Sequence, residues 1–96
     1  MRLKPEQTQF IKSTIARHFG AEARVWLFGS RVDDGKRGGD VDLYVEPNNR
    51  EDLFDRRLRC LGDLVDGLPY PVDLVVAEPG APRAIDRIAL KQGVSL

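Results

Sequence analysis

The sequence lacks several features that mark special classes of protein. Its one cysteine, Cys60, cannot form an internal disulfide, so the framework of a small secreted protein is excluded and a reducing cytoplasm is expected. No apolar run is longer than four residues, whereas a membrane-spanning helix needs ~20. The opening residues lead into a polar segment at Pro5 and do not resemble a signal peptide. We therefore expect a cytoplasmic protein without membrane attachment.

An excess of charge of one sign is also lacking. The chain has 15 Lys plus Arg and 15 Asp plus Glu, and the two signs are mixed along its length. Proteins that coat nucleic acid usually carry a basic surface, so nucleic acid is disfavoured as a partner. A length of 96 residues allows one domain, residues 1–96, with a small hydrophobic core.

Hydrophobic periodicity predicts helices and strands in alternation. Residues 40–46 show the strand pattern most clearly, because Val41, Leu43 and Val45 alternate with polar side chains and Tyr44. The predicted elements are a helix over 5–19, a strand over 24–28, a helical turn and loop over 30–39, a strand over 40–46, a helix over 50–66, a strand over 72–77 and a helix over 83–92. This order predicts a mixed α/β (α+β) fold, a small mixed sheet with helices packed against it.

The helix over 50–66 is strongly amphipathic. Its apolar residues are spaced four and three apart and are expected to face the core: Phe54, Leu58, Leu61, Val65 and Leu68. The pairs Asp52–Arg56 and Asp55–Arg59 are four residues apart and are expected to form ion pairs on the exposed side. The same segment contains the basic residues Arg50, Arg56, Arg57 and Arg59. Interleaved acidic residues favour a solvated, ion-paired face over a phosphate-binding one.

Three aspartates mark the part of the sequence that points to chemistry. Asp40 and Asp42 are two residues apart on a strand, so their side chains point to one face and lie roughly 6.5–7 Å apart along it. Asp73 lies within the third, otherwise apolar strand, where a carboxylate is costly unless it meets a cation. Such carboxylates can hold two Mg²⁺ ions ~3.5–4 Å apart for phosphoryl transfer. The alternative for Asp73 is an ion pair with an arginine such as Arg31.

A Gly-Ser pair lies shortly before the Asp-x-Asp. Gly29 would let the backbone approach a ligand, and Ser30 can present its hydroxyl group and the following amides to a phosphate. Together with the aspartates, this pair indicates a site for a metal-bound triphosphate, with Gly29 and Ser30 as candidate nucleotide-binding residues. Without the aspartates, it would indicate only a strand-to-helix turn with a capping serine.

These residues resemble the minimal nucleotidyltransferase family of the DNA polymerase β superfamily. The family signature is a Gly-Ser pair, a loop, an Asp-x-Asp and a third Asp on a later strand, and segments 27–31, 39–43 and 72–76 supply these parts in order. The resemblance implies the nucleotidyltransferase fold, with ATP as the donor of AMP. It also implies two Mg²⁺ ions and assigns the catalytic and metal-binding roles to Asp40, Asp42 and Asp73. The same resemblance implies that Gly29, Ser30 and Arg31 bind the nucleotide.

The resemblance also implies a partner. Many stand-alone members of this size resemble antitoxins encoded beside a helical HEPN-domain protein, which they silence by binding it or by attaching AMP. The acceptor is expected on another chain, and a homo-oligomer is a further option. One departure from the family lies in the loop, where Asp33 and Asp34 add carboxylates that would repel a triphosphate unless they are paired or face away.

Three functions follow as hypotheses. The first is Mg²⁺-dependent transfer of AMP from ATP to a hydroxyl group of a partner protein, as the antitoxin of a toxin–antitoxin pair. The second is a non-catalytic, partner-binding antitoxin or assembly module that retains the nucleotide or metal site. The third, modification of nucleic-acid ends, is disfavoured by the zero net charge. Packing in the core is expected for Cys60, Trp26 and Phe28, and His18 is expected to be a structural or surface residue.

Overall fold

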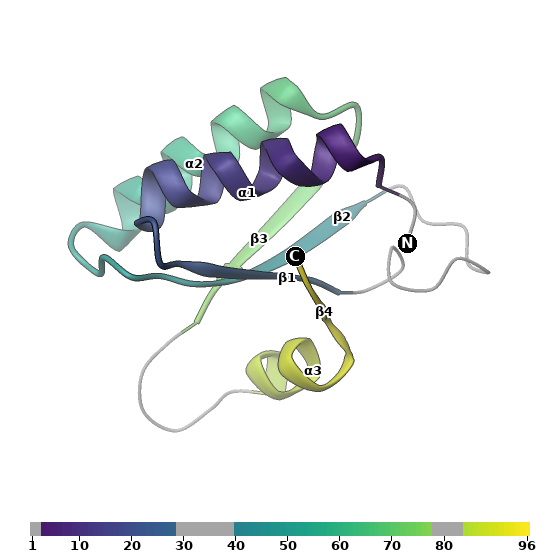
Figure 1. Cartoon of the computed structure of the whole chain (residues 1–96). Coiled ribbons are helices and arrows are strands. Elements are labelled where there is room, and N and C mark those ends of the chain that lie inside the picture. The colour runs from purple at the N-terminus through teal and green to yellow at the C-terminus, as the bar shows by residue number, and fades with distance from the viewer. Residues whose placement is uncertain (1–2, 29–39, 78–83) are drawn as a thin grey trace.

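The computed structural model describes residues 3–28, 40–77 and 84–96, which form a four-stranded sheet with helices on both faces (Figure 1). The elements are α1 (Pro5–Phe19), β1 (Arg24–Phe28), β2 (Val41–Glu46), α2 (Leu53–Gly67), β3 (Val72–Val76), α3 (Ala84–Gln92) and β4 (Val94–Ser95). Helices α1 and α2 lie side by side on one face of the sheet, and α3 lies on the other. The predicted mixed α/β fold is confirmed.

The strand order in the sheet is β3-β2-β1-β4. Strand β1 is antiparallel to both β2 and β4, whereas β2 and β3 are parallel. Parallel neighbours need a long crossover connection, and α2 provides it between β2 and β3. Register in this parallel pair aligns Leu43 with Leu74.

The larger hydrophobic core lies between the sheet and the pair α1 and α2. Its fully buried side chains come from both helices and from the inward residues of three strands: Ile11, Ile15, Phe19, Leu27, Val41, Leu43, Val45, Cys60, Leu64 and Leu74. A smaller cluster on the opposite face joins Phe28, Tyr44 and Ala77 to Ala89 of α3, and Trp26 packs against it. The structural roles expected for Cys60, Phe28 and Trp26 are thus confirmed.

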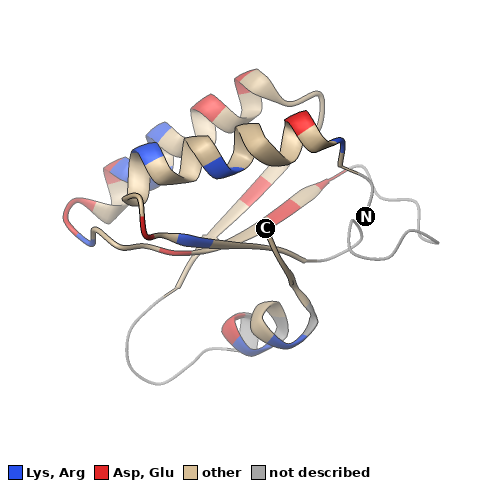
Figure 2. Cartoon of the chain, in the orientation of Figure 1, with Lys and Arg blue, Asp and Glu red and all other residues tan. Residues whose placement is uncertain are grey.

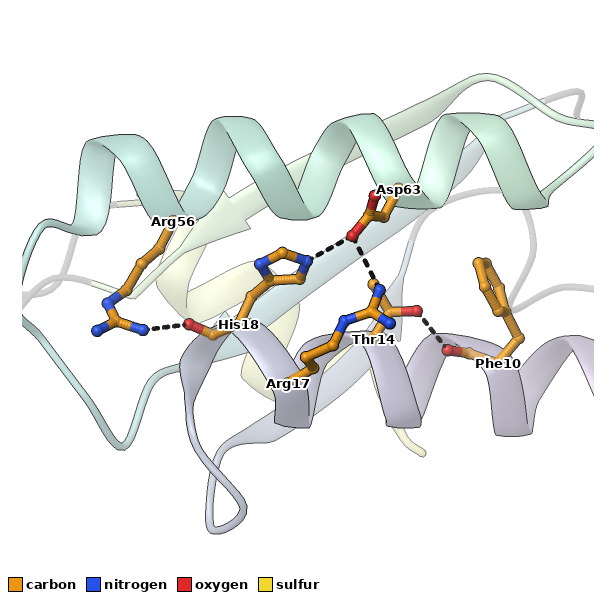
Figure 3. Close-up of polar contacts among 6 residues, drawn as sticks. All are labelled: Phe10, Thr14, Arg17, His18, Arg56 and Asp63. Atoms are coloured by element: carbon orange, nitrogen blue, oxygen red, sulfur yellow. Dashed lines mark hydrogen bonds and ion pairs between the residues drawn. The ribbon is translucent and has the colours of Figure 1, made fainter.

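Polar contacts connect α1 with α2 (Figure 3). Asp63 Oδ2 lies 2.7 Å from His18 Nε2 and accepts a hydrogen bond of 2.8 Å from Arg17 Nη2. The hydrogen bond with His18 is the main cause that lowers the pKa of Asp63 below its usual value, and the charge of Arg17 acts in the same direction. Arg56 Nη1 donates to the backbone oxygen of His18 at 2.8 Å. His18 therefore has the structural role that was expected for it.

The second helix begins later than its periodicity predicts. The pattern predicts residues 50–66, whereas α2 spans Leu53–Gly67. Asn49 Oδ1 accepts a hydrogen bond of 3.0 Å from the backbone amide of Glu51, and Asp52 has left-handed backbone angles of φ 51° and ψ 43°. This side-chain-to-backbone turn competes with the first helical turn and moves the start of the helix to Leu53.

The predicted ion pairs of α2 are wrong. Among the described residues, neither the Asp52–Arg56 nor the Asp55–Arg59 pair forms, and Asp63 pairs with α1 instead. Three arginines donate to backbone oxygens, because carbonyl groups at helix ends and strand edges need donors. The acceptors are Glu51 and His18 for Arg56, Leu74 for Arg57 and Ala77 for Arg50.

Smaller differences occur at other element ends. Strand β4 has no counterpart in the prediction, because two residues that pair with Trp26 and Leu27 leave no periodic signal. Strands β2 and β3 and helix α3 each differ from the prediction by one residue at one end. The helical turn and loop predicted over 30–39 lie outside the described residues. Of the helices in the described ranges, none has the length and apolar character to span a bilayer.

Replacement of two glycines of α2 by alanine should have opposite effects on stability. Nothing lies within 4 Å of a Cβ added at Gly62, so Gly62→Ala should stabilise the fold by about 0.5–1 kcal/mol through helix propensity. A Cβ at Gly67 would collide with the Phe10 ring, so Gly67→Ala should destabilise it by roughly 1–3 kcal/mol. Urea unfolding of dilute protein measures both, and effects of the same sign would contradict this packing.

Candidate active site

The parallel register of β2 and β3 brings two of the predicted aspartates side by side. Asp42 aligns with Asp73 on the neighbouring strand, and Phe28 of β1 is the partner of Asp42 on its other side. Neighbouring strands are about 4.8 Å apart, so the two carboxylates lie close together. We call the surface formed by Asp40, Asp42 and Asp73 the acidic patch. Figure 2 shows acidic bands next to each other on β2 and β3.

Both carboxylates lie on the face of the sheet that α3 partly covers. Side chains alternate along a strand, so Asp42 shares its face with Tyr44, and Asp73 shares its face with Val75. Tyr44 and Val75 pack in the smaller cluster with Ala89 of α3. Helix α3 thus covers the part of this face that contains Tyr44 and Val75. It leaves Asp42 half-buried and Asp73 exposed.

Asp40 is the third member of the acidic patch. It is the residue directly before β2, and its side chain is exposed. Burial is the main cause that raises the pKa of the Asp42 carboxyl group, and the negative charges of Asp73 and Asp40 raise it further. Asp42 is therefore near enough to Asp73 and to Asp40 to be repelled by both. A bound cation would relieve this repulsion.

The donor chemistry of these residues fits magnesium. Carboxylate oxygens are preferred Mg²⁺ ligands, and Mg²⁺ is often held by one or two carboxylates together with waters and substrate phosphates. Within residues 3–28, 40–77 and 84–96, no three His, Cys, Asp or Glu side chains form a preformed metal site. Asp42 and Asp73 would therefore bind Mg²⁺ together with a phosphorylated substrate rather than as a closed protein cage.

The predicted nucleotide-binding residues Gly29, Ser30 and Arg31 lie outside the described residues, as do Asp33 and Asp34. The last described residue before them is Phe28, which is the neighbour of Asp42 in the sheet. The alternative ion pair between Asp73 and Arg31 also involves a residue outside the described ranges. These assignments stay predictions.

Sequence patterns gave no sign of a buried carboxylate next to the acidic patch. Asp86 of α3 is 3% exposed and accepts a hydrogen bond of 2.9 Å from Tyr44 Oη. The contact connects α3 to β2 two residues from Asp42, and the Trp26 ring lies against Tyr44 with a centroid distance of 5.7 Å. An aspartate in the first turn of a helix normally indicates a favourable position near the helix dipole, so nothing in the sequence marked Asp86 as buried.

A polar pocket lies on the opposite side of the sheet. It has a volume of about 350 Å³ and lies between α1 and α2, lined by Arg17, His18, Asp52, Asp55, Arg56 and Arg59. Charges of both signs are mixed in it, and Arg17 and Arg56 already bind groups of the protein. None of the residues predicted for chemistry contributes to this pocket. The acidic patch is therefore the candidate active site.

Metal ions held by carboxylates such as those of Asp42 and Asp73 can stabilise the attacking and leaving oxygens in phosphoryl transfer. A family model described as the nucleotidyltransferase domain matches residues 10–93. The chain belongs to this nucleotidyltransferase domain family. The match includes all three aspartates as well as Gly29 and Ser30, and it agrees with the resemblance found in the sequence.

One solved structure shows the same fold over nearly the whole chain. It is a chain in the crystal structure of a mutant of the toxin–antitoxin MntA–HpeT, which is 22% identical in sequence and has a TM-score of 0.66. The similarity covers 97% of this chain and 71% of the other. Comparison with curated protein sequences gives no significant match.

Removal of the Asp42 charge should stabilise the protein at neutral pH. Because the pKa of Asp42 is raised, the folded state binds its proton more readily than the unfolded chain does. The ionised Asp42 carboxylate therefore destabilises the folded state to its full extent at pH 7. This destabilisation disappears below the ordinary aspartate pKa of about 3.9. Asp42→Asn should raise Tm slightly at pH 7 and leave it unchanged at acid pH.

Asp66→Asn, at an exposed position of α2, is the matched control and should show no such pH-dependent gain. Millimolar Mg²⁺ with ATP should raise the Tm of the wild type and of Asp66→Asn but not that of Asp42→Asn, because only the folded site binds the ion. Differential scanning fluorimetry measures these shifts. An equal response of all three proteins to Mg²⁺ would contradict the assignment of Asp42 to a metal site.

Proposed function

We propose that this chain is a Mg²⁺-dependent nucleotidyltransferase that passes AMP from ATP to a hydroxyl group of a partner protein. The observation that carries the proposal is the alignment of Asp42 with Asp73 on adjacent parallel strands, with Asp40 directly before β2. Asp40 and Asp42 would hold both metal ions, and Asp73 would complete the site of one of them. Burial is the main cause that raises the pKa of Asp42, and the added repulsion by Asp73 and Asp40 supports a cation between these groups.

In the proposed reaction, the acceptor hydroxyl oxygen forms a bond to the α-phosphorus as the bond from this phosphorus to the pyrophosphate oxygen breaks. Asp73 takes the hydroxyl proton, and its exposure supports this role because an acceptor can reach it. Gly29, Ser30 and Arg31 contact the triphosphate. Bound Mg²⁺ would supply neutralisation of the charge on the triphosphate and the leaving pyrophosphate.

We further propose that the chain acts as an antitoxin on a helical HEPN-domain protein in the cytoplasm. The similarity in fold to a chain of a toxin–antitoxin complex supports a toxin partner. The HEPN identity rests on the resemblance of the sequence to minimal nucleotidyltransferases. The reducing cytoplasm agrees with a single, buried cysteine, and it supplies ATP and Mg²⁺.

Transfer of label from α-³²P-ATP to the product of the adjacent reading frame tests the proposal. We expect Mg²⁺-dependent labelling of that protein, and Asp42→Asn should reduce the rate at least 100-fold because a metal ligand and its charge are lost. Asp66→Asn makes the same chemical change outside the proposed site, so this variant should label the adjacent protein at the wild-type rate.

Other outcomes are equally informative. If the wild type binds the adjacent product tightly without labelling it, and if Asp42→Asn binds equally well, the chain is a partner-binding module and the catalytic proposal is wrong. If short RNA is labelled instead of protein, the proposed acceptor class is wrong.

A further inference from the structure

Helix α2 carries a row of apolar side chains that periodicity assigns to the core but that the structure leaves exposed. The exposed fractions are 74% for Phe54, 47% for Leu58 and 49% for Val65. Leu61, between them, is half-buried and packs at the margin of the core. We call Phe54, Leu58, Leu61 and Val65 the α2 stripe. The buried side of α2 is formed instead by Cys60 and Leu64.

Helix geometry explains why periodicity assigned the stripe to the core. At 3.6 residues per turn, the four stripe residues fall within an arc of about 60°, and Cys60 and Leu64 lie roughly 90–130° from its centre. The apolar arc of α2 is therefore wider than the part that the sheet and α1 cover. A contiguous exposed apolar surface on a helix commonly marks an interaction site.

We propose that the α2 stripe binds the α2 stripe of a second copy of this chain, with the two helices antiparallel about a twofold axis. The spacing of the stripe is four, three and four residues, which is the same in either direction. With the axis between positions 59 and 60, Phe54 meets the second copy's Val65, and Leu58 meets the second copy's Leu61. A twofold interface needs such self-complementarity.

Gly62 supports the close approach of a second helix. It lies one turn after Leu58 at the border of the stripe, it is exposed, and nothing lies within 4 Å of a Cβ built on it. A glycine within a helix costs about 1 kcal/mol relative to alanine, and no contact within the described residues requires it. In the antiparallel pair, the missing side chain gives space to the facing helix.

The edge of the sheet next to the stripe is less suited to pairing between copies. Strand β3 is the edge strand on this side, but Arg57 Nε donates to the backbone oxygen of Leu74 at 2.9 Å. This carbonyl group is directed away from β2, and its oxygen already accepts the hydrogen bond from Arg57. A charged side chain from a neighbouring helix that covers an edge strand disfavours addition of another strand. The helical stripe is therefore better suited than this edge of the sheet to binding a second copy.

The size of the stripe sets the expected strength of the dimer. Four side chains on a 15-residue helix bury less than the 1,200–2,000 Å² of a standard interface. We therefore expect a weak, reversible dimer with Kd of about 0.1 mM. The contact is on the side of the sheet opposite the acidic patch, so it is independent of the proposed transfer reaction.

Sedimentation equilibrium of the full chain over a wide concentration range tests the dimer. The wild type should self-associate, and Leu58→Lys should increase Kd at least tenfold because a charge enters the apolar contact. Leu90→Lys is the matched control, since Leu90 is 50% exposed on α3 at the opposite face. It should associate as the wild type does. Circular dichroism of both variants verifies that they fold.

Cysteine crosslinking tests the orientation. Native Cys60 is fully buried, and burial raises the pKa of its thiol to about 12, so it stays unreactive. A mixture of Phe54→Cys and Val65→Cys should form the mixed disulfide faster than either variant links to itself. Faster linkage of Phe54→Cys to itself would overturn the antiparallel pairing.

Two further results would overturn the proposal that a second copy of the chain binds the α2 stripe. One is a wild type that stays monomeric at millimolar concentration. The other is equal association of wild type and Leu58→Lys. If the wild type is monomeric and the adjacent gene's product protects the stripe from hydrogen exchange, the stripe binds that protein instead.

Discussion

The parallel pairing of β2 with β3 is the constraint on which both the core and the candidate active site depend. One register aligns Leu43 with Leu74 beneath the helices and Asp42 with Asp73 on the opposite face. A shift of β3 by one residue would move Asp73 into the core and Leu74 out of it. Each buried leucine stabilises the fold by about 1.5–3 kcal/mol, so burial of the core outweighs the repulsion between carboxylates and holds them together.

The arrangement of layers follows from patterns that are local in the sequence. Alternation over 40–46 and the short apolar strands predict the sheet and its buried side, and α1 has the predicted bounds. The pairing of β4 with Trp26 and Leu27 is a tertiary contact of two residues, so no periodic signal precedes it. The start of α2 depends on the turn at Asn49 and on the backbone of Asp52, which helix propensity does not describe.

Periodicity also cannot say how much of an apolar helix face is covered. It correctly describes α2 as amphipathic, but it does not distinguish Phe54, which is exposed, from Leu64, which is buried. Four-residue spacing likewise suggests ion pairs, whereas Arg56 and Arg57 have nearby carbonyl groups that need donors. In both cases, the outcome depends on which neighbouring elements pack against the helix.

For the candidate active site, the sequence specifies that Asp40 and Asp42 share a face, but the parallel register brings Asp73 beside them. The buried contact between Tyr44 and Asp86 depends on where α3 packs, and thus on the fold as a whole. The family match over residues 10–93 and the shared fold agree with this arrangement. Sequence and register together support a nucleotidyl-transfer site on the α3 face.

A crystal structure with Mg²⁺ and a non-hydrolysable ATP analogue would show directly whether the three aspartates form the nucleotide site. We expect the triphosphate on the α3 face of the sheet, with Mg²⁺ about 2.0–2.1 Å from carboxylate oxygens of Asp42 and Asp73. Nucleotide bound instead in the pocket between α1 and α2, or Mg²⁺ without contact to either aspartate, would contradict this expectation.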